Sequence, residues 1–406
     1  MTSHSLHIQD FSEAETLLAA RAQLMPVAVR PSRIMVRGAG SYLWDHTGAR
    51  YLDFLQGWAV NALGHCPPEI AEALCAQAQT LLNASPAFHN APQLRLASVL
   101  TRAAGLEQVH FANSGAEANE AALKLARKWG RLNRGGAFEI ITTEGSFHGR
   151  TLATMAASGK PGWDLLFPPK MPGFVKVSYG DARAVEAQIG PNTVAVMVEP
   201  IQGEAGVIVP PEGYLRELRR ACDEHNLLLI CDEVQTGMGR TGTLFAHQRE
   251  GVVPDILTLG KGLGGGVPIS AVLASQRAGC FVPGDQGGTY NGNPLMVAVA
   301  SRVFDVVASE PFLLRVRATA HYLEARLTAL CQEHGFSLRG RGLLWALLLP
   351  SDGAESIVQA CFSEGLLINA PRPNVLRLMP SLRVSESEID EFVALLERAL
   401  HSRRLP

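Results

Sequence analysis

Lysine is scarce in this chain, and one lysine stands where an amine could do chemistry. The sequence holds six lysines, and Lys261 is the only one after residue 176. It follows the apolar run Ile256–Leu259 after one glycine and precedes the glycine-rich stretch 262–266. This order predicts an amine at the carboxyl end of a sheet strand, with room for a flat ring beside it. Partial burial would favour the neutral amine that a Schiff base with an aldehyde requires. A lysine in a surface loop is the alternative.

Two glycine motifs near Lys261 suggest bound nucleotides, but neither fits well. The Gly-Lys pair after a strand resembles part of a P-loop, yet Gly262 stands where that loop needs a Ser or Thr for magnesium. Residues 237–242 match GxGxxG, although residues 232–236 separate this match from the preceding strand. The sequence therefore does not favour a dinucleotide site.

A carboxylate at the end of another apolar run could serve the same ring. The run 227–230 leads directly through Cys231 into Asp232 and Glu233. A pyridoxal-type ring acts as an electron sink while its ring nitrogen keeps a proton, and a buried carboxylate secures that proton. Asp232 is the candidate for this role, and a loop acid that caps a helix is the alternative.

The segment Asn113-Ser114-Gly115-Ala116 follows a strand-like run and opens a helix-like one. Unpaired amides at a helix start favour an anion such as phosphate, and small residues allow its close approach. However, Ser114 and Glu117 also fit the S-x-x-E capping box, which needs no ligand. The motif by itself leaves both uses open.

The elements that must position these residues alternate between strands and helices. Helix-like segments include 115–130 and 214–224, and Asn293-Pro294 opens another helix. Alternating strands and helices predict an α/β fold with a mostly parallel sheet covered on both faces. Residues 11–25 are predicted to be helical, and residues 41–55 to form a hairpin that turns at 45–48. The predicted strands are 109–112, 138–142, 193–198, 227–231 and 256–259.

The pattern changes after about residue 311. A helix, the apolar run 343–349, a proline-rich turn at 371–373 and a final helix from Ser385 predict a second, smaller domain. We predict that residues 1–58 and 311–406 form this domain, and that residues 59–310 form the large domain.

The composition narrows the class of protein. Apolar residues make up 47% of the chain and the net charge is −2, which gives no reason to expect nucleic acid or an anionic membrane as partner. The seven cysteines form no CxxC pair, and no apolar run approaches the roughly 20 residues of a membrane span. The first residues lack the basic start and apolar middle of an exported protein. These features predict a cytoplasmic enzyme, and no metal site is predicted.

Taken together, the motifs resemble those of the class III, ornithine-type aminotransferases of fold type I, over nearly the whole chain. The resemblance implies a large domain with a seven-stranded sheet, a smaller α+β domain built from both termini, and pyridoxal 5'-phosphate as cofactor. The motifs that carry it are Tyr51-Leu52-Asp53-Phe54, Asn113 to Ala121, Phe147-His148-Gly149-Arg150, Glu199 to Glu204, Asp232 to Gly237, Lys261 and Gly292-Asn293-Pro294.

The resemblance also implies a role for each matching residue. Lys261 would carry the cofactor, Asp232 would pair with its ring nitrogen, and Glu199 would lie close by. Thr289 would reach the phosphate in the neighbouring subunit, which implies a homodimer with sites at the interface. The other implied contacts are the phosphate with Ser114, Gly115 and Ala116, the ring faces with Phe147 and Val234, and the phenolic oxygen with Gln235.

The implied reaction is ping-pong transfer of an amino group to a keto acid. Arg150 and Arg377 match the family's carboxylate-binding residues, and two guanidinium groups suit a dicarboxylate such as 2-oxoglutarate. Glu204 matches an acid that pairs with the second arginine while a distal amine reacts. The nearest resemblance is to enzymes acting on N2-acetylornithine or succinylornithine. An enzyme for ornithine, 4-aminobutyrate or another ω-amino acid, and a racemase or epimerase on the same fold, are the alternatives.

The chain departs from the usual family pattern at four positions. These are Trp58, Pro67, Pro86 and Asn291. The first three lie in segments expected to line or support the substrate pocket, so they bear on which donor is used.

Overall fold

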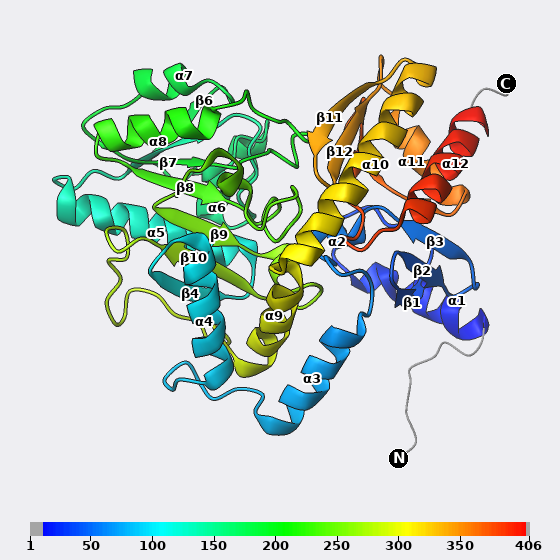
Figure 1. The fold of residues 1–406 in the computed structure, drawn as a ribbon, viewed down its shortest axis with the longest axis horizontal. Coiled ribbons are helices and arrows are strands. Elements are labelled where there is room, and N and C mark those ends of the chain that lie inside the picture. Colours follow the sequence, from blue (N-terminus) through cyan, green and yellow to red (C-terminus); the bar gives the residue numbers. More distant parts are fainter. Residues whose placement is uncertain (1–10, 403–406) are drawn as a thin grey trace.

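A seven-stranded sheet forms the centre of the larger part of the molecule (Figure 1). The computed structural model describes residues 11–402. Strands β9, β8, β7, β5 and β6 are parallel, whereas β10 runs antiparallel to its neighbours β4 and β9. In order across the sheet, the strands are β4 (Gln108–Ala112), β10 (Ser270–Ala274), β9 (Ile256–Leu259), β8 (Leu228–Asp232), β7 (Thr193–Val198), β5 (Glu139–Thr143) and β6 (Phe174–Val177).

The two faces of this sheet are covered by different helices. Alternate residues of β8 pack into two separate apolar clusters, as the two-residue period of a strand requires. Leu229 shares a cluster with Leu218 of α8 (Tyr214–Glu224), whereas Ile230 shares a cluster with Leu125 of α5 (Gly115–Asn133). Burial on both faces explains why these strands read as unbroken apolar runs in the sequence.

The α/β fold and its mostly parallel sheet are therefore confirmed. The five predicted strands are present, with ends that move by at most one residue. The sequence analysis missed β6 and β10. β10 lies between two strands that were predicted, and its antiparallel direction breaks the strand–helix alternation on which the prediction relied.

A smaller part of the molecule contains two four-stranded sheets. One has the order β1-β2-β3-β13, and its parallel β3–β13 pair joins the N-terminal and C-terminal regions of the chain. The other has the order β11-β12-β15-β14. The division at residues 58 and 310 stays a prediction. The strands are β1 (Met35–Ala39), β2 (Tyr42–Asp45), β3 (Arg50–Asp53), β11 (Ser337–Arg341), β12 (Leu344–Leu348), β13 (Leu366–Leu367), β14 (Asn369–Arg372) and β15 (Val375–Leu378).

Two local predictions need adjustment. The proline-rich turn is shorter than expected, because Pro371 and Arg372 belong to β14 and only residues 373 and 374 turn. The N-terminal helix α1 (Phe11–Ala19) continues as a 3₁₀ helix (Ala20–Gln23). The inference that the first residues lack an export-type pattern concerns residues 1–10, which lie outside the described residues.

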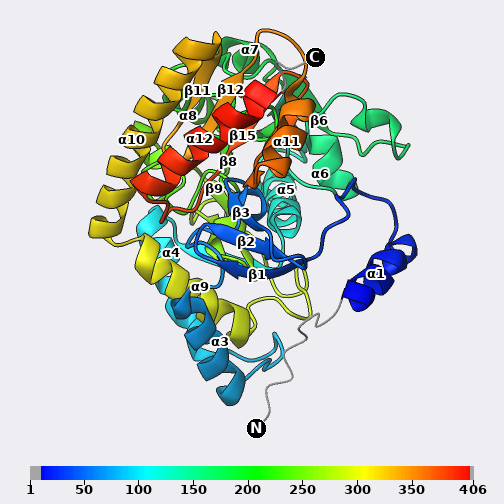
Figure 2. The ribbon, with the colours of Figure 1, turned by 90° about the vertical axis from the view of Figure 1, so that its right-hand side faces the viewer.

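The remaining helices pack around these sheets. Asn293 caps α9 as predicted, because its side chain accepts a hydrogen bond from the amide of Met296. The long helix α10 lies beside β11 and α12 (Figure 2). Within residues 11–402, no helix is long and apolar enough to cross a membrane. The helices are α2 (Gln56–Ala59), α3 (Pro68–Thr80), α4 (Ala91–Ala104), α6 (Leu152–Ala157), α7 (Ala182–Ala187), α9 (Pro294–Val307), α10 (Glu310–His334), α11 (Ala354–Ser363) and α12 (Glu386–Ser402).

Candidate active site

Three neighbouring parallel strands end at one edge of the large sheet, and each delivers an ionisable residue there. Glu199 follows the last residue of β7, Asp232 is the last residue of β8, and Lys261 lies two residues beyond β9. The carboxyl ends of parallel strands meet at the same edge, which is where open α/β sheets bind ligands. All three side chains line one cavity of about 270 Å³.

Lys261 stands in a strained backbone conformation at the start of a short 3₁₀ turn. Its φ angle of 40° lies in the left-handed region, which non-glycine residues rarely adopt and which is often found at functional sites. Burial lowers the pKa of the Lys261 ammonium, Glu204 opposes that change, and Arg377 adds to it. The amine therefore loses its proton more readily than an exposed lysine does.

The Asp232 carboxylate is buried and has hydrogen-bond donors at both oxygens. Oδ2 accepts a hydrogen bond from Asn119 Nδ2 at 2.7 Å and from His148 Nδ1 at 2.8 Å. Oδ1 accepts from the amide of Val234 at 3.0 Å and from Thr258 Oγ1 at 3.3 Å. A carboxylate held by several donors keeps its orientation.

Glu199 is buried at the same sheet edge as Asp232. Burial, followed by the negative charge of Asp232, raises the pKa of Glu199 well above its ordinary value. The amide of Phe147 donates a hydrogen bond to Glu199 Oε1 at 2.8 Å. The site thus favours the neutral form of Glu199.

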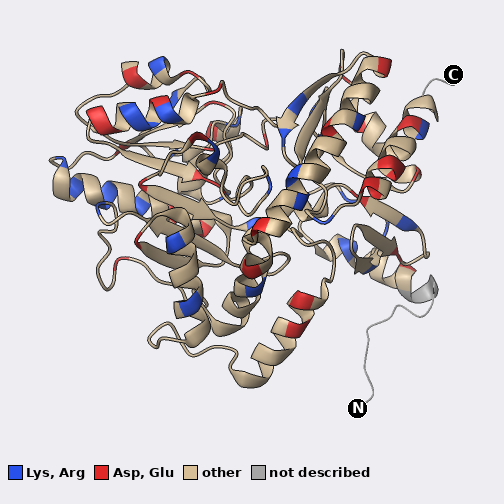
Figure 3. Cartoon of the chain, viewed as in Figure 1, with Lys and Arg blue, Asp and Glu red and all other residues tan. Residues whose placement is uncertain are grey.

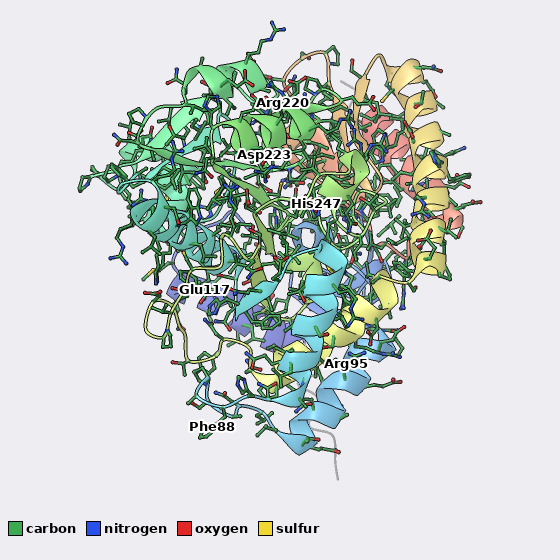
Figure 4. All side chains as sticks on the ribbon, turned by 60° about the vertical axis from the view of Figure 1, so that its left-hand side comes forward. Phe88, Arg95, Glu117, Arg220, Asp223 and His247 are labelled. Atoms are coloured by element: carbon green, nitrogen blue, oxygen red, sulfur yellow. The ribbon has the colours of Figure 1, made fainter. Side chains whose placement is uncertain are left out.

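The start of α5 lies at the same sheet edge, directly after β4. The Ser114 side chain accepts a hydrogen bond from the amide of Glu117 at 3.3 Å and donates one to Glu117 Oε2 at 3.0 Å, so Ser114 caps the helix (Glu117 is labelled in Figure 4). Glu117 Oε2 accepts from the amide of Asn113, not from that of Ser114, so the described contacts do not complete the predicted capping box. Gly115 and Ala116 line the cavity, and their amides lie in the first helical turn, where no intrahelical acceptor exists. The cap and an anion site can coexist here.

Close packing around Val234 and Gln235 requires glycine at two positions. A Cβ atom at Gly115 would lie 2.7 Å from Val234 Cγ1, and one at Gly203 would lie 1.5 Å from Gln235 Oε1. The Gln235 side chain is buried and lines the cavity, yet neither its Oε1 nor its Nε2 has a hydrogen-bond partner in the described chain. Unpaired buried polar atoms are costly, so this amide fits a ligand atom.

Arg377 is fully buried in β15 and reaches the cavity through Glu204. Its Nη1 donates to Glu204 Oε1 at 2.6 Å, and its Nε donates to Asn369 Oδ1 at 3.2 Å. Burial raises the pKa of Glu204, but the charges of Arg377 and Lys261 outweigh burial and lower it overall. Arg377 Nη2 has no partner among residues 11–402.

Arg150 also lines the cavity and is exposed. Its guanidinium lies 5.4 Å from the centre of the Trp163 ring, and the same ring packs edge-on against Phe147 at 5.5 Å. Trp163 therefore connects the exposed arginine to an aromatic ring in the cavity wall. The sequence analysis did not single out Trp163.

The cavity brings together ten of the thirteen predicted site residues. Ser114, Arg377 and Thr289 are not in its lining, although Ser114 adjoins it and Arg377 contacts it through Glu204. Thr289 is exposed in the loop before α9. The lining comprises Gly115, Ala116, Asn119, Phe147, His148, Gly149, Arg150, Glu199, Glu204, Asp232, Val234, Gln235 and Lys261.

Sequence reasoning missed three lining residues: Asn119, His148 and Gly149. Asn119 and His148 lie in quoted motifs, but the sequence did not show that both donate to Asp232. A signal existed for Asn119, since it lies one helical turn after Gly115 and therefore on the same face of α5.

The departures from the family pattern lie outside the cavity lining of the described chain. Trp58 is exposed, and it lies in a segment, residues 56–59, whose backbone φ angles are positive. Asn291 accepts a hydrogen bond from Asn113 Nδ2 at 2.8 Å, so it supports the residue before Ser114.

These groups suit pyridoxal phosphate. A carboxylate of fixed orientation can face the ring nitrogen, an amine of lowered pKa can hold the aldehyde carbon, and unpaired helix amides can receive the phosphate. The unpartnered Gln235 amide supplies polar atoms for a ring substituent.

Comparison with known proteins agrees with this chemistry. Residues 24–400 match the family model for class-III aminotransferases. The chain is 54% identical to acetylornithine aminotransferase 2 of Bordetella bronchiseptica, over 94% of this chain and 97% of that protein. It is 52% identical to the acetylornithine aminotransferase of Ralstonia nicotianae, over 93% and 96% of the two chains.

Solved structures give the same result. The crystal structure of N-acetylornithine aminotransferase from Stenotrophomonas maltophilia superposes with a TM-score of 0.81 at 36% identity, covering 95% of this chain and 98% of that one. An ornithine aminotransferase structure from Toxoplasma gondii, described with partial occupancy of PLP at the active site, superposes with a TM-score of 0.90 at 34% identity, covering 98% and 96%. The chain therefore belongs to the class-III aminotransferases and is a pyridoxal-phosphate-dependent enzyme.

Proposed function

We propose that this enzyme moves the distal amino group of an ornithine-type donor, N2-acetylornithine in preference to others, to 2-oxoglutarate by a ping-pong mechanism. The names of its relatives at 52–54% identity support the donor. Two arginines at the cavity, Arg150 and Arg377, support a dicarboxylate acceptor. The observation that carries the proposal is the shared cavity of Lys261 and Asp232.

In this proposal Lys261 and Asp232 perform the proton work. Bound pyridoxal phosphate supplies an electron sink for the charge that develops at the substrate carbon. Lys261 Nζ, whose pKa burial lowers, takes a proton from the substrate carbon and later returns one. Asp232, fixed by Asn119 and His148, keeps a proton on the ring nitrogen.

The surrounding residues bind and orient. Ser114, Gly115 and Ala116 would hold the phosphate at the start of α5, because the free amides and the helix dipole favour an anion. Phe147 and Val234 would enclose the ring. Gln235 would contact the phenolic oxygen with its unpartnered amide, and Glu199 would lie near the ring as a neutral carboxyl.

Glu204 and Arg377 would act as a substrate-dependent pair. While the amino donor reacts, the ion pair between Glu204 and Arg377, at 2.6 Å, would neutralise the charge of Arg377 beside the distal amine of the donor. When the keto acid enters, Glu204 would move aside. Arg377 would then bind a carboxylate of the keto acid through two parallel hydrogen bonds from its guanidinium group. Arg150, exposed and stacked on Trp163, would bind the other carboxylate.

We further propose a homodimer in which Thr289 completes the partner's phosphate site. The exposed position of Thr289, outside its own chain's cavity, is compatible with this role. Sedimentation should give a dimer, and Thr289→Ala should weaken cofactor binding. A monomer with full activity would contradict the proposal.

A panel of amino donors with 2-oxoglutarate tests the substrate assignment. We expect kcat/KM to be highest for N2-acetylornithine, with N2-succinylornithine, ornithine and 4-aminobutyrate below it, and parallel double-reciprocal plots for the two substrates. A higher kcat/KM for 4-aminobutyrate or ornithine would overturn the donor, and intersecting plots would overturn the ping-pong order. Racemisation of a single amino acid without a keto acid would indicate the racemase alternative.

A further inference from the structure

A second cavity, of about 280 Å³, lies where the loop after β8 meets α10 and the turn between β11 and β12. It is as large as the catalytic cavity and shares no lining residue with it. Neither the resemblance nor the reaction above uses it. Its charged lining residues are Arg249, Arg317, Arg341 and Glu324.

The cavity has an excess of positive charge. Arg317 pairs with Glu310 at 2.5 Å and donates to the carbonyl of Gly242 at 3.2 Å. In contrast, the guanidinium groups of Arg249 and Arg341 make no hydrogen bond or ion pair with any residue that the structure describes. Figure 3 shows Lys and Arg segments on both α10 and β11, which lie side by side. Two guanidinium groups are thus left without a partner.

The acids nearby do not remove this excess. Glu324 lies 3.9 Å from His321, and Glu250 accepts a hydrogen bond from the amide of Arg216 at 3.4 Å. Burial, followed by the like charge of Arg249, lowers the pKa of Arg341, and the opposing influences of Glu250, Tyr179 and Glu212 are smaller. Two like charges held together without a counter-ion are unfavourable until an anion joins them.

Close packing and hydrogen bonds hold the walls of this second cavity in place. A Cβ atom at Gly342 would lie 2.6 Å from the carbonyl oxygen of Arg240, so the β11–β12 turn presses directly on the loop after β8. Trp345 Nε1 donates to the carbonyl of Gly342 at 2.6 Å and fixes the turn. Thr241 lines the cavity, is 7% exposed, and its hydroxyl has no partner in residues 11–402.

We propose that this cavity binds the phosphate group of a small anion, through Arg249, Arg341 and Thr241. A phosphate carries close to two negative charges at neutral pH and several acceptor oxygens, which matches two unpaired guanidinium groups and one free hydroxyl. A single carboxylate would neutralise only one of the two arginines. The ligand is either free inorganic phosphate or a small phosphate monoester, for which the remaining volume leaves space.

Isothermal titration of the holoenzyme with inorganic phosphate, in a phosphate-free buffer of low ionic strength, tests the proposal. Saturation with cofactor occupies the catalytic phosphate site, so that site does not contribute. We expect binding, with Kd raised about tenfold by Arg249→Gln and further by the Arg249→Gln/Arg341→Gln double variant. Arg220→Gln, on α8 (labelled in Figure 4), is the matched control and should leave Kd unchanged.

The outcomes separate the possibilities. AMP that binds more tightly than phosphate, while adenosine does not bind, would identify a phosphate monoester as the ligand; phosphate binding without AMP binding would identify the free ion. The absence of phosphate binding, or an equal Kd in wild type and the double variant, would overturn the proposal. Single Arg249→Gln keeps the test decisive if the double variant does not fold, because Arg249 is exposed.

Discussion

The two ends of the catalytic cavity differ in how completely the protein satisfies its own polar groups. At the Asp232 end, both carboxylate oxygens have two donors each. At the other end, where Arg377 meets Glu204, Arg377 Nη2 is unpaired within the described chain. The Asp232 carboxylate is fully paired by the protein alone, and we call its side the complete end; the Arg377 side, the open end, is left to ligands.

This difference follows the division of work in a transaminase. In the proposed mechanism, Asp232 contacts a cofactor that stays in place. The hydrogen-bonding groups around Asp232 therefore need not reorganise between turnovers. In the proposed ping-pong reaction, the Arg377 end accepts two different substrates in succession, so its polar groups would change partners. Substitutions at the complete end should therefore affect every substrate alike, whereas those at the open end should discriminate between substrates.

The largest effect is expected from Lys261→Ala. Removal of the amine abolishes proton transfer at the substrate carbon, so kcat should fall by roughly a thousandfold or more with every donor. Lys160→Ala is the control, because Lys160 packs against Trp163 and does not line the cavity. Stopped-flow half-reactions measure both variants, and normal turnover by Lys261→Ala would remove Lys261 from the mechanism.

Asp232→Asn tests the complete end directly. The amide keeps the shape but loses the charge that holds a proton on the ring nitrogen, so kcat should fall roughly a hundredfold or more. The loss should be similar for N2-acetylornithine, ornithine and 4-aminobutyrate. A loss confined to one donor would show that the two ends are not separate in function.

At the open end, Arg377→Lys should change one half of the reaction. Lysine cannot form two parallel hydrogen bonds with a carboxylate, so KM for 2-oxoglutarate should rise roughly tenfold while the donor half-reaction changes less. Arg398→Lys is the matched control, since Arg398 pairs with Glu364 on the exposed face of α12. Equal effects on both half-reactions would contradict the division between the ends.

The smallest effect is a shift in pH dependence caused by Glu204→Gln. Glu204 raises the pKa of Lys261, so its neutralisation should lower that pKa further. Cofactor uptake by the apoprotein requires the neutral amine and therefore increases with pH. The midpoint of this increase should move to lower pH in Glu204→Gln and stay in place in Glu364→Gln. A shift to higher pH would show that Glu204 does not act on Lys261.

The sequence predicted the parts of the site that depend on local order. Lys261 and Asp232 were located from the ends of predicted strands. This was possible because a strand buried on both faces of a sheet appears in the sequence as an unbroken apolar run of strand length. Motif resemblance added Glu204 and Arg377, which are 173 residues apart and meet only in the folded chain.

The remaining contacts could not be predicted because they depend on tertiary geometry. His148 and Asn119 converge on Asp232 from a loop and a helix far apart in sequence. β10 was missed because it is antiparallel to β9, and antiparallel neighbours need no crossover helix between them. The strand–helix alternation used for the prediction therefore gave no sign of this strand. The second cavity arises where three separate segments meet, so no single motif marks it.

The most direct test of the central claim is to locate the cofactor on the chain. Borohydride treatment of the holoenzyme, followed by peptide mass spectrometry, should find the reduced cofactor on Lys261 and on none of the other five lysines. The label should be absent from Lys261→Ala and present in Asp232→Asn. Label on another lysine of the wild-type enzyme, with Lys261 unmodified, would contradict the account.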